Sequence, residues 1–397
     1  MERRELAERV AGWRAGMPSG AMLIDEVDPA RFMASFAGAV SGERDLFLAN
    51  PSWRSRERAE FGRLVKAGAP QERGWLMIPS GGAGGELKFA RHDAGTIASA
   101  VGGFCGHFGM GRVNSVCVLP LHHVSGFMAW MRSALTGGTF LPCPWKEIEA
   151  GRFPVELPPD CCLSLVPTQL QRLLASASAV AWLQRFRVIF VGGGPAWDGL
   201  VGEAARLGLP ISTGYGATET AAMVAALKPE QFLAGMRGCG SALPHARIDL
   251  VDGVVRVSGE SVFRGYFPQT LETRSWTSSD LGAFCADGSL TILGRLDDLI
   301  ITGGKKVSPA EVEAALRSSG QFEDVAVIGL ADPQWGQSVV ACHPKGASAP
   351  AIGPVEAALA GLAPFKRPKR YAEISPWPRN AQGKIDRAEL ARLASGG

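Results

Sequence analysis

The chain has 397 residues, enough for two or three domains, and a formal net charge of only +3. So small a charge does not indicate a nucleic-acid partner, and the basic run at 365–370 is interpreted as a solvated loop. No apolar run reaches the length of a membrane span. The opening segment, residues 1–13, mixes acids with arginines and is typical of an amphipathic helix, not of a signal peptide.

The eight cysteines form no CxxC pair, which predicts reduced, mostly buried thiols in a cytoplasmic protein. The cysteines and histidines between positions 105 and 123 match no zinc-site spacing. We therefore expect no metal apart from magnesium that accompanies a nucleotide. A homodimer is left open.

Residues 94–245 alternate strand-like and helix-like segments. Residues 113–121 are a strand candidate, and 161–174 are typical of a strand followed by a helix, with Thr168 as its cap. Short β-rich runs bounded by glycine follow at 186–194 and 209–216. Such alternation predicts a parallel α/β sheet, whose ligands bind at the carboxyl ends of the strands.

After residue 246 apolar and polar residues alternate around Asp252 and Asp287, each followed by glycine, which predicts two hairpins. Farther on, Ser308 is followed by Pro309 and predicts the start of an amphipathic helix. We place a domain boundary at Asp297. This divides the chain into a large domain, residues 1–296, and a small C-terminal domain, residues 297–397.

The stretch "PSGGAGGELKFARHD" at 79–93 has the composition of a phosphate-binding loop. It ends in neither the GK[ST] of a P-loop nor the third glycine of a dinucleotide fingerprint. Successive backbone N–H groups in a glycine-rich turn still form an anion nest, and Lys88 would add a positive charge. The same stretch also fits a flexible turn.

"GYGATETA" at 214–221 offers three groups suited to a nucleotide. Tyr215 has a flat face for a purine, Thr218 a hydroxyl for phosphate and Glu219 a carboxylate for Mg²⁺. A capping role for Thr218 and Glu219 at a helix start is the alternative.

Two further stretches carry charges. Asp280 can accept both hydroxyls of a ribose and Arg295 can reach ribose or phosphate, although either charge also fits a surface ion pair. Lys384 lies in the polar turn "PRNAQGK", where a lone lysine is usually only solvated.

In this order the four stretches resemble the adenylate-forming superfamily, which includes acyl-CoA synthetases, luciferases and peptide-synthetase adenylation domains. The resemblance covers residues 75–387 and rests on YGATE, GRLDD and PRNAQGK. It implies an α/β fold with a large N-terminal domain of parallel-rich sheets, a small antiparallel β region and a small mobile α+β C-terminal domain. Three segments are similar to the o-succinylbenzoate–CoA ligases of menaquinone and phylloquinone biosynthesis: "LPLHHVSGFMAWMRSALTGG", "VGGGPA" and "GYGATETAAMVAALKPEQFLAGMRGCGSALPHARI". The segment before the glycine loop is shorter than is usual in the superfamily.

The resemblance implies an AMP-forming acid–thiol ligase that uses ATP, Mg²⁺ and coenzyme A on a small carboxylic acid. Lys384 would bridge the substrate carboxylate and the α-phosphate, and Glu219 would hold Mg²⁺. The other residues implied at the nucleotide are Ser80, Gly82, Lys88 and Thr218 at pyrophosphate, Gly192, Gly193, Gly194 and Tyr215 at adenine, and Asp280 and Arg295 at ribose. Against the usual hydroxyl-rich loop, Ser80 keeps one of four hydroxyl positions.

For the second half-reaction, the resemblance implies that the small domain rotates about Asp297 and brings Gly303 and Gly304 to a pantetheine channel. His123 and Trp335 occupy positions that line this channel in relatives, with interdomain packing as the alternative for Trp335.

The acyl pocket is expected between the 123–132 helix, the "VGGG" loop and the loop at Gly214. Arg132 lies nine residues after His123, about two and a half helical turns. It is predicted to pair with the unreactive aromatic carboxylate of o-succinylbenzoate, which suits a bidentate guanidinium. A surface or ion-paired arginine is the alternative.

Two other functions are left open by the sequence. The first is a ligase for another aryl or short acyl acid. The second is a nucleotide-binding protein without catalysis, which the hydroxyl-poor loop favours. Retention of Glu219, Asp280, Arg295 and Lys384 argues against the second.

Overall fold

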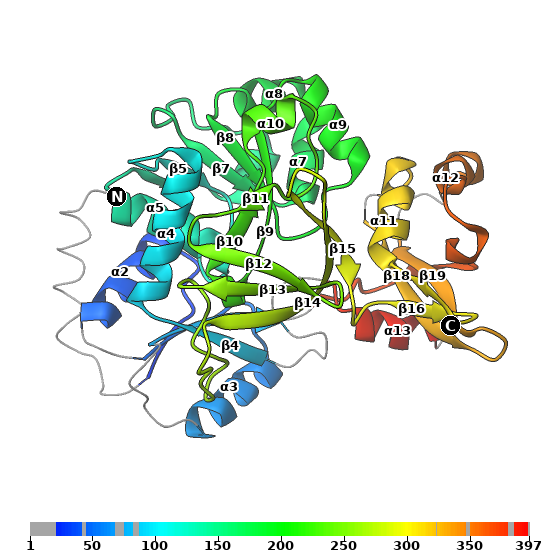
Figure 1. Cartoon of the computed structure of the whole chain (residues 1–397), viewed down its shortest axis with the longest axis horizontal. Helices are drawn as coiled ribbons and strands as arrows, with labels where there is room; N and C mark the ends of the chain where they lie inside the picture. Colours follow the sequence, from blue (N-terminus) through cyan, green and yellow to red (C-terminus); the bar gives the residue numbers. More distant parts are fainter. Residues whose placement is uncertain are drawn as a thin grey trace.

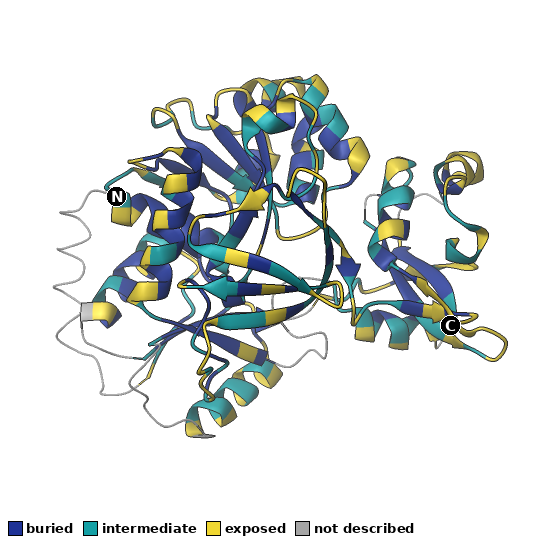
Figure 2. Cartoon of the chain, viewed as in Figure 1, coloured by how far each residue is buried: buried dark blue, intermediate teal, exposed yellow. Residues whose placement is uncertain are grey.

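The computed structural model describes residues 21–41, 45–67, 75–81, 87–322, 324–346, 350–379 and 385–395. Three sheets form a large body, and a fourth sheet with its helices forms a smaller lobe at one side (Figure 1). Figure 2 shows that the buried residues follow the sheets and the inner faces of the helices. The predicted amphipathic helix at 1–13 lies outside the described residues.

The seven-stranded sheet has the strand order β11-β10-β9-β8-β7-β5-β6, and its β5 to β9 are parallel, as predicted. The strands are β5 (Ser115–Cys117), β6 (Phe140–Pro142), β7 (Cys162–Leu165), β8 (Val188–Val191), β9 (Ile211–Ala217), β10 (Ala222–Ala226) and β11 (Ser241–Ala242). Strands β5 to β8 are short and mostly apolar, and every residue of β8 is buried, because helices cover both faces of a parallel sheet.

The helices of this region come mainly from the connections between its strands. They are α4 (Ala94–Phe108), α5 (Val124–Thr136), α6 (Trp145–Glu149), α7 (Pro167–Leu174), α8 (Ala177–Leu183), α9 (Asp198–Arg206), α10 (Pro229–Leu233) and the 3₁₀ turn η2 (Thr218–Thr220). Helix α4 begins with a capping box, in which the Asp93 carboxylate accepts from the Thr96 N–H at 2.8 Å.

Two local predictions in this sheet were wrong. Only Ser115–Cys117 of the candidate 113–121 is strand, since an apolar run does not by itself show where pairing stops. Helix α7 is capped by Val166 and not by Thr168, because Pro167 takes the first helical position, where its missing N–H costs nothing.

A four-stranded sheet precedes this region and frames the glycine-rich loop. Its elements are β1 (Met22–Ile24), α2 (Pro29–Ser41), β2 (Leu46–Leu48), α3 (Ser55–Ala67), β3 (Leu76–Gly81) and β4 (Leu87–His92). Strands β3 and β4 are antiparallel, and their register places Ser80 opposite Lys88. The two side chains that the sequence assigned to phosphate are therefore cross-strand neighbours in position.

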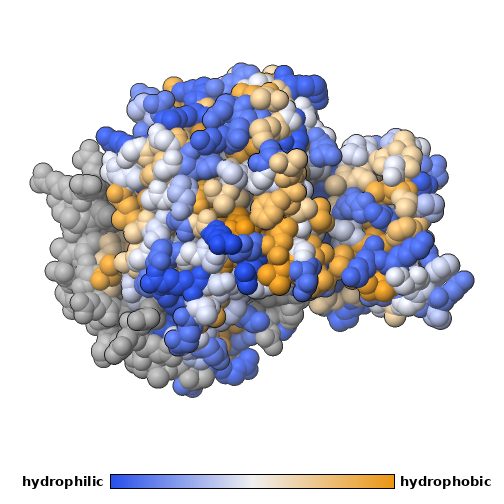
Figure 3. Space-filling view, viewed as in Figure 1, coloured by the Kyte–Doolittle hydropathy of each residue, from blue (hydrophilic) through white to orange (hydrophobic). Residues whose placement is uncertain are grey.

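The antiparallel sheet of the large body confirms both predicted hairpins. Its strands are β12 (Ala246–Val251), β13 (Val254–Gly259), β14 (Ser275–Phe284) and β15 (Leu290–Arg295). Asp252 and Gly253 both have positive φ, 52° and 78°, as a two-residue hairpin turn requires. Figure 3 shows apolar residues gathered on the visible face of the body, next to the small lobe. The exposed large apolar residues of this sheet and its end are Val251, Phe284, Leu293 and Leu296.

The small lobe has its own sheet and its own apolar core, which includes Val312, Val327 and Val339. Its elements are β16 (Ile300–Thr302), β17 (Lys305–Val307), α11 (Pro309–Ser318), β18 (Ala326–Asp332), β19 (Gly336–Pro344), α12 (Ile352–Leu359), the 3₁₀ turn η3 (Pro364–Lys366), β20 (Arg370–Ile374) and α13 (Arg387–Ser395). Helix α11 starts after Ser308, as predicted.

Several negative findings apply to the described residues only. Within them, none of the helices has the length and apolar character to cross a membrane. The same residues contain no group of three or more His, Cys, Asp or Glu side chains arranged to hold a metal ion. All eight cysteines are free, and four of them are buried.

Candidate nucleotide and acyl site

Glu219 is buried and is held by two hydroxyl donors. It belongs to η2, directly after β9, and the Ser80 hydroxyl from β3 donates to its Oε1 at 2.5 Å. The Tyr266 hydroxyl donates to the same oxygen at 2.7 Å. Among the described residues neither donor uses Oε2, so this carboxylate oxygen is open to a further ligand. A hard carboxylate with a free oxygen fits Mg²⁺.

Tyr266 also connects Glu219 to the glycine-rich hairpin. Its ring lies 5.8 Å from the Lys88 ammonium, measured from ring centroid to Nζ. Burial and then the negative charge of Glu219 raise the pKa of Tyr266, so the hydroxyl stays a donor at neutral pH. Ser80, Lys88 and Glu219 therefore surround one tyrosine, which the sequence did not predict as a site residue.

A second pair of side chains is formed by Tyr215 and Asp280. The Tyr215 hydroxyl donates to Asp280 Oδ2 at 2.7 Å, and Arg295 Nη1 lies 3.4 Å from Oδ1. Asp280 and Arg295 are register partners on β14 and β15, which explains their contact. A carboxylate has about four acceptor positions, so Asp280 keeps acceptor capacity for a hydroxyl of a ligand.

Thr218 is linked to the sheet through its backbone. The His92 Nε2 lies 2.8 Å from the Thr218 carbonyl oxygen, and His92 Nδ1 lies 3.1 Å from the Thr96 hydroxyl. Burial lowers the pKa of His92 to about 4, so the ring is neutral at pH 7 and bridges β4 to η2. The Thr218 side chain forms no hydrogen bond with a described residue and is half-buried.

The predicted glycines lie on two adjacent strands. Gly192, Gly193 and Gly194 follow β8, and the Gly192 N–H donates to the Leu165 carbonyl at 3.1 Å. Gly214 lies within β9, where a Cβ would come 2.7 Å from the Ala225 carbonyl oxygen. The close approach of β10 is thus sufficient to explain glycine at 214.

His123 and Arg132 are both positioned by α5. His123 is its N-cap, and its ring centroid is 4.4 Å from that of His122. Arg132 is only 6% exposed, and its guanidinium carbon lies 4.0 Å from the centroid of Phe104 and 6.0 Å from that of Phe190. Burial lowers the pKa of Arg132 to about 10.

The alternative of a surface or ion-paired Arg132 is wrong for the described residues. None of them forms a hydrogen bond or an ion pair with its guanidinium, and its Nε is buried without a partner. A cation over an aromatic ring gains about 0.5–2 kcal/mol, whereas burial of a charge costs several kcal/mol. The aromatic contacts do not offset this cost, and a bound anion would.

Of the residues predicted for a pantetheine channel, Gly303, Gly304 and Trp335 lie together in the small lobe, whereas His123 is the N-cap of α5 in the large body. Gly303 and Gly304 form the β16–β17 turn, with φ of 55° and 75°. The Gly303 N–H donates to the Trp335 carbonyl at 2.8 Å, and the indole lies against the position that a Gly303 side chain would take. Lys369 Nζ lies 4.1 Å from the Trp335 ring centroid. These contacts are all within the lobe, so they do not show packing of Trp335 between domains.

Two predicted residues, Gly82 and Lys384, lie outside the described residues. On either side of the Lys384 segment, Arg379 and Ile385 form an isolated antiparallel bridge.

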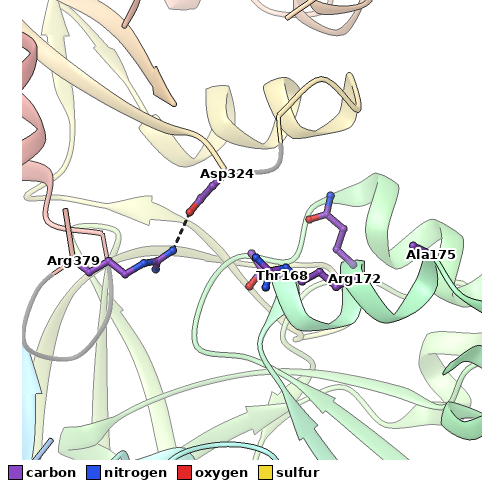
Figure 4. Close-up of a pocket in the computed structure, with 6 residues that line it drawn as sticks. Thr168, Arg172, Ala175, Asp324 and Arg379 are labelled. Atoms are coloured by element: carbon purple, nitrogen blue, oxygen red, sulfur yellow. Dashed lines mark hydrogen bonds and ion pairs between the residues drawn. The ribbon is translucent and has the colours of Figure 1, made fainter. Parts of the chain in front are cut away.

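A cavity of about 250 Å³ separates α7 of the large body from the small lobe (Figure 4). On the small-lobe side, the Arg379 guanidinium pairs with Asp324 at 3.1 Å. The cavity is lined by Thr168, Gln171, Arg172, Ala175, Asp324 and Arg379. None of the predicted site residues lines it.

Contact between the two bodies is made near α9 and at the end of β15. The Arg317 guanidinium on α11 lies 5.6 Å from the Trp197 ring centroid, and the Ser308 hydroxyl donates to the Leu293 carbonyl at 3.3 Å. Arg295 also pairs with Asp297 at 2.6 Å, in the segment that joins β15 to β16. The connection is therefore one short segment with a few polar contacts.

This fold and site define an adenylate-forming class of protein, and the family comparison agrees. The model described as "AMP-binding enzyme" matches residues 39–267, more than half of the chain. The model described as "AMP-binding enzyme C-terminal domain" matches residues 311–384. The chain belongs to the AMP-binding enzyme family, which confirms the resemblance and the fold class predicted from the motifs.

Its relatives include the 2-succinylbenzoate–CoA ligases of Geobacillus kaustophilus and Bacillus cereus. The first is 33% identical over 302 residues, which are 70% of this chain and 60% of the relative. The second is 29% identical over 326 residues, 77% of this chain and 66% of the relative. The aligned chain thus spans less than two thirds of the length of these relatives.

Solved structures show the same fold. The o-succinylbenzoate CoA synthetase from Bacillus subtilis in complex with its acyl-adenylate intermediate superposes with a TM-score of 0.81, at 23% identity, over 97% of this chain and 90% of that chain. The same synthetase in complex with ATP and magnesium ion superposes with a TM-score of 0.79.

Proposed function

We propose that the chain is an AMP-forming acid–thiol ligase, and that its acid is 2-succinylbenzoate. In the first half-reaction, a carboxylate oxygen of the acid forms a bond to the α-phosphorus of ATP and pyrophosphate leaves. In the second, the thiol of coenzyme A forms the thioester and AMP leaves. The observation that carries the chemistry is the pairing of Glu219 with two hydroxyl donors beside the Tyr215–Asp280–Arg295 cluster.

Each cluster suits one part of the nucleotide. Asp280 would accept the ribose hydroxyls, held in place by Tyr215 and Arg295. Glu219 would hold Mg²⁺ through Oε2, since Oε1 already accepts two hydrogen bonds. The ion, when bound, neutralises phosphate charge that would repel the attacking carboxylate. Lys88 would contribute a positive charge on the pyrophosphate side.

The small lobe would serve both half-reactions. Lys384 would bridge the substrate carboxylate and the α-phosphate, and rotation about Asp297 would then exchange it for Gly303 and Gly304. Support comes from the short connection, because β15 ends at Arg295 and β16 begins at Ile300. We also propose that the boundary between the two domains lies at 296/297. Residues proposed to contact the bound substrates are Gly82, Thr218, Gly192–Gly194 and Gly214.

The choice of 2-succinylbenzoate rests on the relatives and on Arg132. The two curated relatives are named for this acid, and the buried guanidinium needs an anion. We propose that it pairs with the aromatic carboxylate, which does not react. Arg132→Leu should raise the Michaelis constant for 2-succinylbenzoate, and an unchanged constant would remove Arg132 from the acyl pocket.

Thioester formation with four acids tests the whole proposal. Wild-type protein is given ATP, Mg²⁺ and coenzyme A with 2-succinylbenzoate, benzoate, coumarate or acetate, and the products are separated by chromatography. A thioester with 2-succinylbenzoate alone supports the proposal. A product with another acid would keep the ligase and change its substrate. AMP binding without any product would indicate a nucleotide-binding protein that lacks catalysis.

The proposal also includes a cellular compartment and leaves the oligomeric state to experiment. Eight free thiols suit a reducing compartment such as the cytoplasm. A homodimer is tested by light scattering of the purified chain.

A further inference from the structure

Near Arg132 lies a second polar side chain whose buried nitrogens have no partner among the described residues. Both ring nitrogens of His245 are buried and form no hydrogen bond with any described residue. His245 lies in the loop between β11 and β12, and none of the roles predicted from the sequence was assigned to it. An imidazole that is buried with neither nitrogen bonded is costly to maintain, which points to a ligand.

The fold places this ring directly on helix α4. A Cβ built at Gly103 would lie 1.8 Å from His245 Nδ1, so only glycine at 103 leaves room for the imidazole. The next residue of the helix is Phe104, whose ring carries the Arg132 guanidinium at 4.0 Å. His245 and Arg132 therefore approach the same turn of α4.

Electrostatics agrees with this proximity. Burial, and next the positive charge of Arg132, lower the pKa of His245 to about 4. The imidazole is thus neutral at pH 7, with one N–H donor and one acceptor nitrogen. A neutral ring avoids repulsion with the guanidinium and still offers a donor to an anion.

The surroundings connect this pair to the expected acyl pocket. Leu243, two residues before His245, packs in one apolar cluster with Phe104 and Phe190. Phe190 lies on β8, two residues before the Gly192 loop. The unpartnered donors thus lie in an apolar region next to the strand end where the acid is expected.

We propose that His245 acts with Arg132 as the receptor for the unreactive carboxylate of an aromatic dicarboxylic acid. One carboxylate oxygen accepts from the guanidinium and the other from the imidazole N–H. His245 is then a specificity-determining residue, which distinguishes acids by a second charge remote from the reacting carboxylate. The inference rests on the proposed function and names the group that selects its substrate.

Two variants and a matched pair of acids test this receptor. His245→Phe fills the space on Gly103 and removes both nitrogens, whereas His245→Gln restores a donor. The acids are 2-succinylbenzoate and 4-oxo-4-phenylbutanoate, which is the same molecule without the aromatic carboxylate. Each is measured in ATP–pyrophosphate exchange and by the shift in melting temperature that it produces in the presence of AMP.

For the His245→Phe variant, we expect KM for 2-succinylbenzoate to rise about tenfold or more, since a hydrogen bond to a charged group is lost. Its kcat, and both constants for 4-oxo-4-phenylbutanoate, should stay within about twofold, and His245→Gln should recover part of the loss. A purely structural role would instead weaken both acids equally and lower the melting temperature of the free protein.

The result that overturns the inference is a His245→Phe variant that still prefers the dicarboxylate as strongly as the wild type does. This outcome differs from failure of the proposed function, in which the wild type itself gives no exchange with 2-succinylbenzoate. The melting-temperature shifts do not depend on catalysis. They therefore decide between presence and absence of the receptor even when exchange is not observed.

Discussion

Replacing Tyr266 with Phe removes one hydroxyl and keeps the ring, so it tests how far Glu219 depends on this donor. The hydroxyl lies 2.7 Å from Oε1, and the only other donor to this oxygen among the described residues is Ser80. A hydrogen bond to a charged group contributes about 1.5–3 kcal/mol. Mutation of a residue that hydrogen-bonds to a metal ligand typically lowers metal affinity about 10- to 100-fold. We expect the Mg²⁺ concentration for half-maximal pyrophosphate exchange to rise about tenfold or more.

The chain provides its own control for this substitution. It has only three tyrosines, and the third, Tyr371, is 40% exposed on β20 of the small lobe. Tyr371→Phe should leave the Mg²⁺ requirement unchanged. The assay is exchange of labelled pyrophosphate into ATP over a Mg²⁺ titration, at one fixed excess of ATP and acid. If Tyr266→Phe and wild type gave the same titration curve, Tyr266 would not position Glu219, and the assignment of Oε2 to Mg²⁺ would lose its basis.

Three further predictions concern other parts of the molecule. Lys384→Ala should abolish adenylation and largely spare thioester formation from supplied acyl-adenylate; equal loss in the two separate assays would exclude a rotation that withdraws Lys384. Tyr215→Phe should raise KM for ATP about tenfold with kcat little changed, because Asp280 loses a donor at 2.7 Å; an unchanged KM would remove Asp280 from the ribose. Burial lowers the pKa of His92 to about 4, from an unfolded value of about 6.5, so the unfolded chain binds the proton first as pH falls. The free energy of unfolding should therefore fall by up to roughly 3 kcal/mol between pH 6.5 and 4, relative to a His92→Gln variant in urea denaturation, and parallel pH profiles would contradict this.

Elements with a strong local signal were predicted correctly from the sequence. Alternating polarity around Asp252 and Asp287 was sufficient for two hairpins, because turn chemistry and strand period depend on neighbouring residues only. The pairing of Asp280 with Arg295 also follows from such a hairpin, since their register is set by the turn between them. The contact between Asp280 and Arg295 could therefore be expected from the sequence.

Contacts between distant segments were not accessible in this way. The hydrogen bond from the Ser80 hydroxyl to Glu219 joins residues 139 positions apart in the chain, and no local pattern predicts it. Tyr266 was missed because nothing in its local sequence shows that it faces η2. The sequence did not indicate a role for His245 either. Its ring lies against Gly103 of α4, and this contact between distant segments has no local pattern. Such contacts arise from packing of whole elements, which neither spacing nor propensity contains.

The polar groups proposed to bind the nucleotide and those proposed to bind the acid differ in whether they already have hydrogen-bond partners within the chain. On the proposed nucleotide side, Glu219 and Asp280 already have donors within the chain, so they are oriented before a ligand arrives. On the proposed acyl side, Arg132 and His245 have buried nitrogens without partners among the described residues. An acid that lacks the second carboxylate would leave these nitrogens unpaired in the complex as well. A site built to bond a polar group discriminates strongly against an analogue without it, by about 10⁴-fold in favourable cases. Selection of the acid would therefore come from the cost of unpaired donors, while binding of the nucleotide would depend on carboxylates that are already held.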